Sequence, residues 1–205
     1  VLALSPVKPI TVGMALEAGR ITPQTLIDTG PGRYSIGGFT ISDTHNYGAL
    51  TVEGVIQKSS NVGALKIAQR MSPQEMWNTY TALGYGQKPR IQFPGAVSGR
   101  LRPWKTWRPV EQATMAYGYG VSVTAIQLAH AYATIGALGV ARPVSMLKVE
   151  GDVAGERVIT ERTARTRLVQ ADRLSTLGML AADTDLNLAN IDFTGLSQQG
   201  LPYIG

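Results

Sequence analysis

A serine and a lysine near the start of the chain have the types and the spacing that nucleophilic catalysis requires. Ser5 and Lys8 are three residues apart, and the pair Ser5-Pro6 predicts that a helix begins here. Because three residues return to nearly the same helix face, the lysine amine can reach the serine hydroxyl. A lysine desolvated among apolar neighbours can accept the hydroxyl proton without help from a histidine. The pattern therefore indicates acyl transfer through an activated serine.

A second polar group, Ser59-Ser60-Asn61, follows at another predicted helix start. Its hydroxyl and side-chain amide could relay a proton and hold a substrate amide. Both groups also have a purely structural interpretation, since serine and asparagine cap helices in proteins of every kind. The Ser-x-x-Lys spacing recurs at Ser145 to Lys148, where we expect it to be a coincidence. Spacing alone therefore does not establish a site.

Capping and turn residues predict the elements that would position these groups. The signals are a helix from Ser5-Pro6 to Gly19, a hairpin from Arg33 to Ile41 turning at Gly37-Gly38, a helix from Ser72 to Gly84, and a helix starting at Thr124. Further on, we expect a strand from Val144 to Val149, a polar turn from Gly151 to Glu156 and an amphipathic helix from Thr160 to about Ala182. The predicted strand content is low.

Composition excludes several classes of function. The chain has no cysteine, which excludes disulfides, a thiolate nucleophile and cysteine-ligated metals. Its two histidines, His45 and His130, have no metal-ligand spacing, so we expect neither a metal nor a cofactor. No apolar run approaches the roughly 18 residues of a membrane span. The chain opens at Val1 without a methionine or a signal sequence, so we expect a soluble fragment.

Charge divides the chain into two parts. Residues 1–165 hold 17 Lys and Arg against 10 Asp and Glu, whereas residues 166–205 hold 2 against 4. We therefore predict a boundary near Arg165. One loop alternates basic residues with tryptophans: Arg100, Arg102, Trp104, Lys105, Trp107 and Arg108. Such a loop could bind nucleic acid. We favour a solvated loop whose tryptophans are anchored in the core, and expect no nucleic-acid partner.

Four longer stretches carry a family resemblance. They are SPVKP at residues 5–9, LTVEGVIQKSSNVG at 50–63, EQATMAYGYG at 111–120, and VTAIQLAHAYATIG at 123–136 followed by Arg142-Pro143. Ser-x-x-Lys and Ser-x-Asn belong to the motif set of penicillin-binding proteins and serine β-lactamases. In order and spacing, the stretches resemble the division-specific (FtsI-type) class B penicillin-binding proteins, which are peptidoglycan D,D-transpeptidases. The resemblance covers roughly residues 5–165.

The resemblance implies an α+β transpeptidase fold of the penicillin-binding and serine β-lactamase type, incomplete and mostly its helical part. It implies that Ser5 is the acylated nucleophile, Lys8 its general base, Ser59 a proton relay and Asn61 the group that holds the donor amide. Ser60, Tyr117 and Gly118 are the expected substrate-binding residues. The implied partners are peptidoglycan stem peptides, β-lactam antibiotics and membrane proteins of the divisome. The implied location is the periplasmic face of the inner membrane, with the anchor outside this chain.

Three departures from the family leave other functions open. The third family motif, Lys-Ser/Thr-Gly, does not occur in the 205 residues, and Val1 to Leu4 replace the usual approach to the serine. Residues 166–205 do not follow the family, although they are faintly similar to its pedestal region. One alternative is a catalytically incomplete binding or assembly module of the division machinery. A β-lactamase or carboxypeptidase is another, although residues 117–120 and 124–127 look more like the transpeptidases.

Overall fold

The computed structural model describes residues 6–91, 93–146, 150–151 and 153–165. Their elements, in chain order, are α1 (Val7–Glu17), β1 (Leu26–Asp28), β2 (Arg33–Ile36), β3 (Phe39–Ser42), β4 (Ala49–Thr51), α2 (Val52–Gln57), α3 (Asn61–Ala68), α4 (Pro73–Ala82), the 3-10 helix η1 (Trp104–Thr106), α5 (Pro109–Met115), α6 (Ala125–Gly136), β5 (Val140–Ala141), β6 (Glu156–Arg157) and α7 (Glu161–Arg165). Helices thus dominate the described chain, as the sequence predicts.

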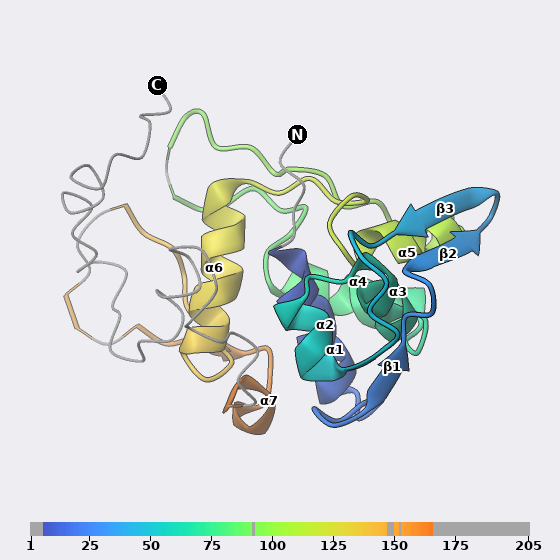
Figure 1. Ribbon diagram of the computed structural model, residues 1–205. Coiled ribbons are helices and arrows are strands. Elements are labelled where there is room, and N and C mark those ends of the chain that lie inside the picture. The colour runs from blue at the N-terminus through green and yellow to red at the C-terminus, as the bar shows by residue number, and fades with distance from the viewer. Residues whose placement is uncertain (1–5, 92, 147–149, 152, 166–205) are drawn as a thin grey trace, which may run out of the picture.

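Helix α1 is the centre of the fold. Every residue from Val7 to Ala15 is buried, because α2, α3, α4 and α7 all pack against this helix (Figure 1). A helix that is apolar on all sides is stable only when it is enclosed in this way. The helix ends as predicted before Gly19, whose φ of 65° allows the chain to turn. Its burial also removes Lys8 from solvent.

The described strands form three antiparallel pairs, β1 with β4, β2 with β3, and β5 with β6. In the β2–β3 hairpin, Ile36 pairs with Phe39, so the turn contains two residues, as predicted. These are Gly37 and Gly38, with φ angles of 57° and 81°, which a type I′ turn requires. The hairpin projects from one side of the molecule (Figure 1). Its second strand leads directly to Asp43, which lies beside the start of α3.

Two further helices begin with the predicted capping boxes. In α4, Ser72 accepts from the backbone N–H of Glu75, whose carboxylate accepts from the Ser72 N–H. In α6, Thr124 and Gln127 make the same reciprocal pair. The hydroxyl of Tyr132 in α6 also donates to the carbonyl of Pro6 at 2.8 Å. This bond fixes α6 against the beginning of α1, at a residue two positions before Lys8.

The segment after α6 departs from the predicted pattern. Val144 to Met146 is not a strand, and the remaining residues of that prediction, 147–149, lie outside the described part. The strand next in sequence, β6, spans only two residues and pairs with Val140 and Ala141, so it does not extend the ladder to Val144. Glu156, expected in a turn, begins β6. The helix predicted from Thr160 is α7 as far as Arg165, and the rest of it lies outside the described residues.

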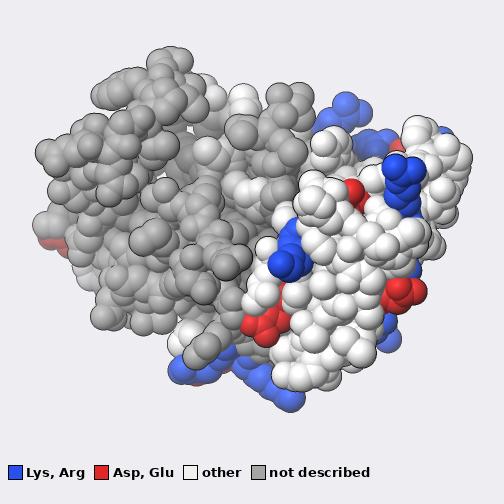
Figure 2. Space-filling view, in the orientation of Figure 1, with Lys and Arg blue, Asp and Glu red and all other residues white. Residues whose placement is uncertain are grey.

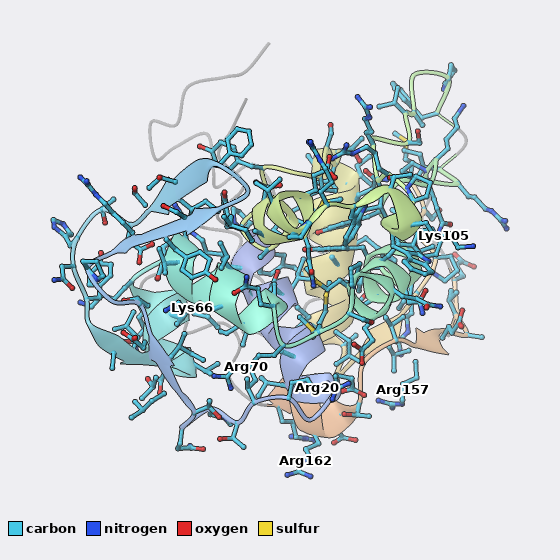
Figure 3. The ribbon with its side chains drawn as sticks, turned by 90° about the vertical axis from the view of Figure 1, so that its right-hand side faces the viewer. Arg20, Lys66, Arg70, Lys105, Arg157 and Arg162 are labelled. Atoms are coloured by element: carbon cyan, nitrogen blue, oxygen red, sulfur yellow. The ribbon has the colours of Figure 1, made fainter. Side chains whose placement is uncertain are left out.

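Charged side chains stand as separate patches on the mostly uncharged face that Figure 2 shows. In Figure 3, Lys66 and Lys105 lie on opposite sides of the view, whereas Arg20, Arg70, Arg157 and Arg162 lie in its lower part. In the basic and aromatic loop, the side chain of Trp107 is buried, and its indole N–H donates to the Arg102 carbonyl at 3.0 Å. No helix among the described residues is long and apolar enough to cross a membrane.

Candidate active site

The junction between α2 and α3 places the residues of the second polar group. The N–H of Ser59 donates to the Ile56 carbonyl, and the N–H of Ser60 donates to the Val55 carbonyl, both at 3.0 Å. This bond pair is the Schellman arrangement, in which the residue at the position of Ser59 is left-handed and usually glycine. Ser59 accordingly has a φ of 53°, which is unfavourable for a residue with a Cβ. The fold therefore holds a strained serine between two helices.

Lys8 lies directly beneath this serine. Its side chain comes from the first turn of α1, and its ammonium donates to the Ser59 carbonyl at 2.7 Å and to the Ser59 hydroxyl at 2.8 Å. The lysine is only 3% exposed. Desolvation lowers the pKa of Lys8 to about 8, and the negative charge of Asp43 opposes that effect. An amine with this pKa can both accept and release a proton near neutral pH.

Asp43 connects the end of the hairpin to the start of α3. Its Oδ1 accepts from the backbone N–H of Asn61 at 2.6 Å and from that of Val62 at 3.0 Å. Its Oδ2 accepts from the Ser60 hydroxyl at 2.6 Å. The carboxylate thus satisfies N–H groups that a helix leaves unpaired at its N-terminus. Sequence analysis missed Asp43, although its position two residues after the end of the predicted hairpin was a signal.

The structure brings together Lys8, Ser59, Ser60 and Asn61 from segments about 50 residues apart. Ser60 is 1% exposed and caps α3, accepting from the Gly63 N–H at 2.8 Å. The side-chain amide of Asn61 donates to the Ser42 carbonyl at 3.1 Å. The Ser60 hydroxyl is therefore engaged within the fold, and its expected contact with substrate stays a prediction.

The remaining predicted residues have separate positions. Ser5 lies outside the described residues, immediately before Pro6. Tyr117 and Gly118 lie in the turn after α5, and both are buried. Burial raises the pKa of the Tyr117 hydroxyl, so this group stays protonated at neutral pH. Its ring lies 5.4 Å from that of the exposed Tyr119, measured between centroids. The expected substrate contacts of these residues stay predictions.

The described residues offer no cluster of three or more His, Cys, Asp or Glu side chains that could hold a metal ion. His45 lies next to Tyr47, with ring centroids 5.9 Å apart. His130 lies elsewhere, with its ring nitrogens near the carbonyls of Leu83 and Arg142. The contact between Lys8 and Ser59 permits proton transfer between a buried amine and a hydroxyl group.

Known proteins with similar sequences are peptidoglycan enzymes. The probable peptidoglycan D,D-transpeptidase PenA of Neisseria meningitidis is 43% identical over 161 residues, which are 78% of this chain and 27% of that protein. The peptidoglycan D,D-transpeptidase FtsI of Escherichia coli K12 is 42% identical over 162 residues, 79% of this chain and 27% of the relative. The chain thus spans about a quarter of the length of these relatives.

A solved structure gives the same relationship at the level of the fold. The apo transpeptidase domain of penicillin-binding protein 3 from Burkholderia pseudomallei superposes with a TM-score of 0.77 and 53% identity, over 78% of this chain and 49% of that one. The family model for the penicillin-binding protein transpeptidase domain matches residues 5–170. A match over most of the chain, together with the Lys8–Ser59 geometry, establishes that the chain belongs to the penicillin-binding protein transpeptidase domain family.

Proposed function

We propose that this chain supplies the serine and lysine half of a peptidoglycan D,D-transpeptidase site, acting in the cross-linking of the septal cell wall. One observation carries the proposal: the buried amine of Lys8, with a pKa of about 8, lies 2.8 Å from the hydroxyl of Ser59. A purely structural lysine would gain stability by keeping its charge in water, where hydration is strongest. Keeping it buried beside the Ser59 hydroxyl favours a proton-transfer role.

The proposed reaction begins with neutral Lys8 taking the proton of the Ser5 hydroxyl. The Ser5 oxygen attacks the carbonyl carbon of the penultimate D-alanine in a stem peptide. The bond from that carbon to the terminal D-alanine nitrogen breaks, and Lys8 returns the proton to the leaving amine through Ser59. Terminal D-alanine departs, and an ester to Ser5 remains. An amine of a second stem peptide then attacks the carbonyl carbon of this ester and forms the cross-link. The bond from that carbon to the Ser5 oxygen breaks, and Lys8 takes a proton from the amine and passes it to the Ser5 oxygen, which restores the serine.

Substrate positioning is assigned to the residues around this pair. In the proposal, Asn61 orients the amide of the donor peptide, and Tyr117 and Gly118 line the path to the serine. The chain contains no Lys-Ser/Thr-Gly sequence, which supplies an oxyanion-hole N–H in the family. Loss of one such donor raises a barrier by roughly 3 to 4 kcal/mol. We therefore expect slow turnover by the isolated chain, with acylation of Ser5 as the measurable step.

Location and partners follow from the same assignment. Peptidoglycan is assembled outside the cytoplasmic membrane, so the proposed site of action is the periplasmic face of the inner membrane. β-Lactams would acylate Ser5 in place of the stem peptide, and divisome membrane proteins would be the macromolecular partners. These proposals are supported by the similarity to FtsI and PenA.

The test is covalent labelling of the purified chain with a fluorescent penicillin, followed by a denaturing gel. We expect a labelled band in the wild type and none in Ser5→Ala. The second Ser-x-x-Lys occurrence provides a matched control, because Ser145→Ala alters the same local pattern at a site with no proposed role. Label that persists in Ser5→Ala would overturn the proposal. A folded chain that takes no label would favour the alternative function, a binding module of the division machinery.

A further inference from the structure

We propose that Asp43 is a positioning residue for the transpeptidase reaction, holding the turn that presents the Ser59 hydroxyl to Lys8. The inference deepens the proposed function and rests on it for its catalytic consequence. Asp43 does not touch Ser59 itself in the described contacts; it binds the three residues that follow it. It would therefore act through Ser60 and the first turn of α3, without entering the reaction.

The contacts of Asp43 form a complete clamp on the start of α3. One carboxylate oxygen accepts the backbone N–H groups of Asn61 and Val62, and the other accepts the Ser60 hydroxyl. Charge-assisted bonds of this length are stronger than neutral ones. Because the Ser60 hydroxyl donates to Asp43 while it accepts from Gly63, both functions of that hydroxyl are used. Ser60 is thereby fixed in position and in proton orientation.

The contacts that hold Ser60 matter because the backbone conformation of Ser59 is unfavourable by itself. Its φ of 53° places a residue with a Cβ in the left-handed region, which costs about 1 kcal/mol or more unless the neighbours enforce it. The α2 end holds Ser59 from one side through the Ile56 and Val55 carbonyls. Asp43 holds the other side, and it comes from a separate element, the end of the β2–β3 hairpin. Release of either side would let the turn relax.

Asp43 also acts on Lys8 by its charge. Its negative charge raises the pKa of Lys8 against the larger effect of burial. Two independent observations, the hydrogen-bonded clamp and the charge near the ammonium, thus connect Asp43 to the same pair of reacting groups.

The experiment compares Asp43→Asn and Asp43→Ala with the wild-type chain. Asparagine retains an oxygen for the two N–H groups and removes the charge, whereas alanine removes the clamp entirely. We expect Lys8, followed by NMR of its side-chain ammonium, to titrate at lower pH in Asp43→Asn, since the opposing charge is lost. We expect the rate of acylation by the fluorescent penicillin to fall about 100-fold in Asp43→Ala and about 10-fold in Asp43→Asn. The acidic limb of the rate profile should move with the Lys8 titration.

Ser72→Ala is the matched control, because it removes a comparable helix cap from α4, outside the proposed site. It should lower stability as an ordinary cap does and leave both the Lys8 titration and the acylation rate unchanged. Labelling that proceeds in the Asp43 variants at the wild-type rate would overturn the inference while leaving the proposed function intact. A wild-type chain that takes no label would defeat the proposed activity, and a shifted Lys8 titration in Asp43→Asn would then still support the electrostatic connection of Asp43 to Lys8. If Asp43→Ala does not fold, Asp43→Asn decides the question.

Discussion

The ammonium of Lys8 makes two hydrogen bonds to Ser59, one to its carbonyl and one to its hydroxyl, at 2.7 and 2.8 Å. The carbonyl bond fixes the lysine on the backbone of the turn, and the hydroxyl bond is the route that we propose for the proton. Lys8 is buried, whereas Ser59 is exposed. A proton accepted in a dry environment can therefore pass to a group that substrate can reach.

Lys8 should make the stability of the chain depend on pH. Its pKa is lowered from the ordinary value of 10.5 to about 8, so the folded state disfavours the charged form. Below pH 8 this effect lowers the free energy of unfolding in full. Between pH 8 and 10.5 Lys8 is protonated in the unfolded chain and neutral in the folded one, so the free energy of unfolding rises with pH across this interval. We expect Lys8→Met to be more stable than the wild type at pH 7 by about 2 kcal/mol after allowance for solvent screening.

Urea unfolding of both proteins at pH 7, 8, 9 and 10 measures this difference. Comparison with Lys8→Met removes the contribution of the other titrating groups, including the buried tyrosines, whose pKa values are raised by desolvation. The stability gap should narrow steadily above pH 8. A gap of constant size over the whole range would mean that Lys8 titrates normally.

Ser59 should show a conflict between stability and reactivity. Ser59→Gly removes the Cβ that makes a φ of 53° unfavourable, whereas Ser59→Ala keeps the Cβ and loses only the hydroxyl. We expect the glycine variant to be more stable than the alanine variant by about 1 kcal/mol. Both should lose penicillin acylation to the same extent, because both lack the oxygen that we propose as the proton relay. Thermal unfolding and gel labelling of the two variants test this. Equal stabilities would show that the left-handed backbone is not strained.

Local signals in the sequence predicted the elements well. The adjacent glycines at 37 and 38 specified a two-residue turn, and the capping boxes at Ser72 and Thr124 specified two helix starts. Each of these depends on residues at most a few positions apart. The spacing of Ser5 and Lys8 likewise predicted that Lys8 would lie in the first turn of a helix, where α1 places it.

Local patterns could not supply the long-range partners, although the family resemblance placed Lys8 and Ser59 in one site. The bond from Lys8 to Ser59 joins residues 51 positions apart, and Asp43 reaches α3 from the end of a hairpin. No local pattern encodes such a pairing; only the packing of α1, β3 and α3 creates it. The strand expected from Val144 is likewise not formed at residues 144–146, because pairing along the chain is long-range too: β6 pairs with Val140 and Ala141 and spans only two residues.

Gly63 should be required for the close approach of α3 to α2. A Cβ at this position would lie 2.6 Å from the Cγ2 of Val55 and 3.0 Å from the Ser60 hydroxyl oxygen. We expect Gly63→Ala to lower the free energy of unfolding by about 1 to 3 kcal/mol and to slow acylation, because the displaced Ser60 carries Ser59 with it. Gly54→Ala in α2 is the control: its Cβ meets nothing closer than 3.3 Å, and alanine favours the helix. Urea unfolding of both variants provides the comparison, and similar values for the two would refute the argument.

Gln127 should stabilise the fold by holding the loop that follows α4, between Gly84 and Ser98. Its side-chain amide donates to the carbonyls of Gly84, Gln87 and Ser98 at 2.8 to 3.0 Å, while its oxygen accepts from Thr124. Gln127→Glu would aim a carboxylate oxygen at three carbonyl oxygens, so we expect a loss of about 3 kcal/mol at pH 7.5. These carbonyls raise the pKa of the new glutamate in the folded state, so its protonation at lower pH restores a donor and the loss should shrink.

Urea unfolding at pH 5 and 7.5 tests this expectation, with Thr124→Ala as the control. The control removes the cap of α6 and leaves the three carbonyl contacts in place, so it should cost about 1 kcal/mol at both pH values. The glutamate variant should differ from the control in two ways, by a larger loss at pH 7.5 and by a partial recovery at pH 5. A loss that equals the control's, or that does not change with pH, would mean that the loop is held by other contacts and that Gln127 serves α6 alone.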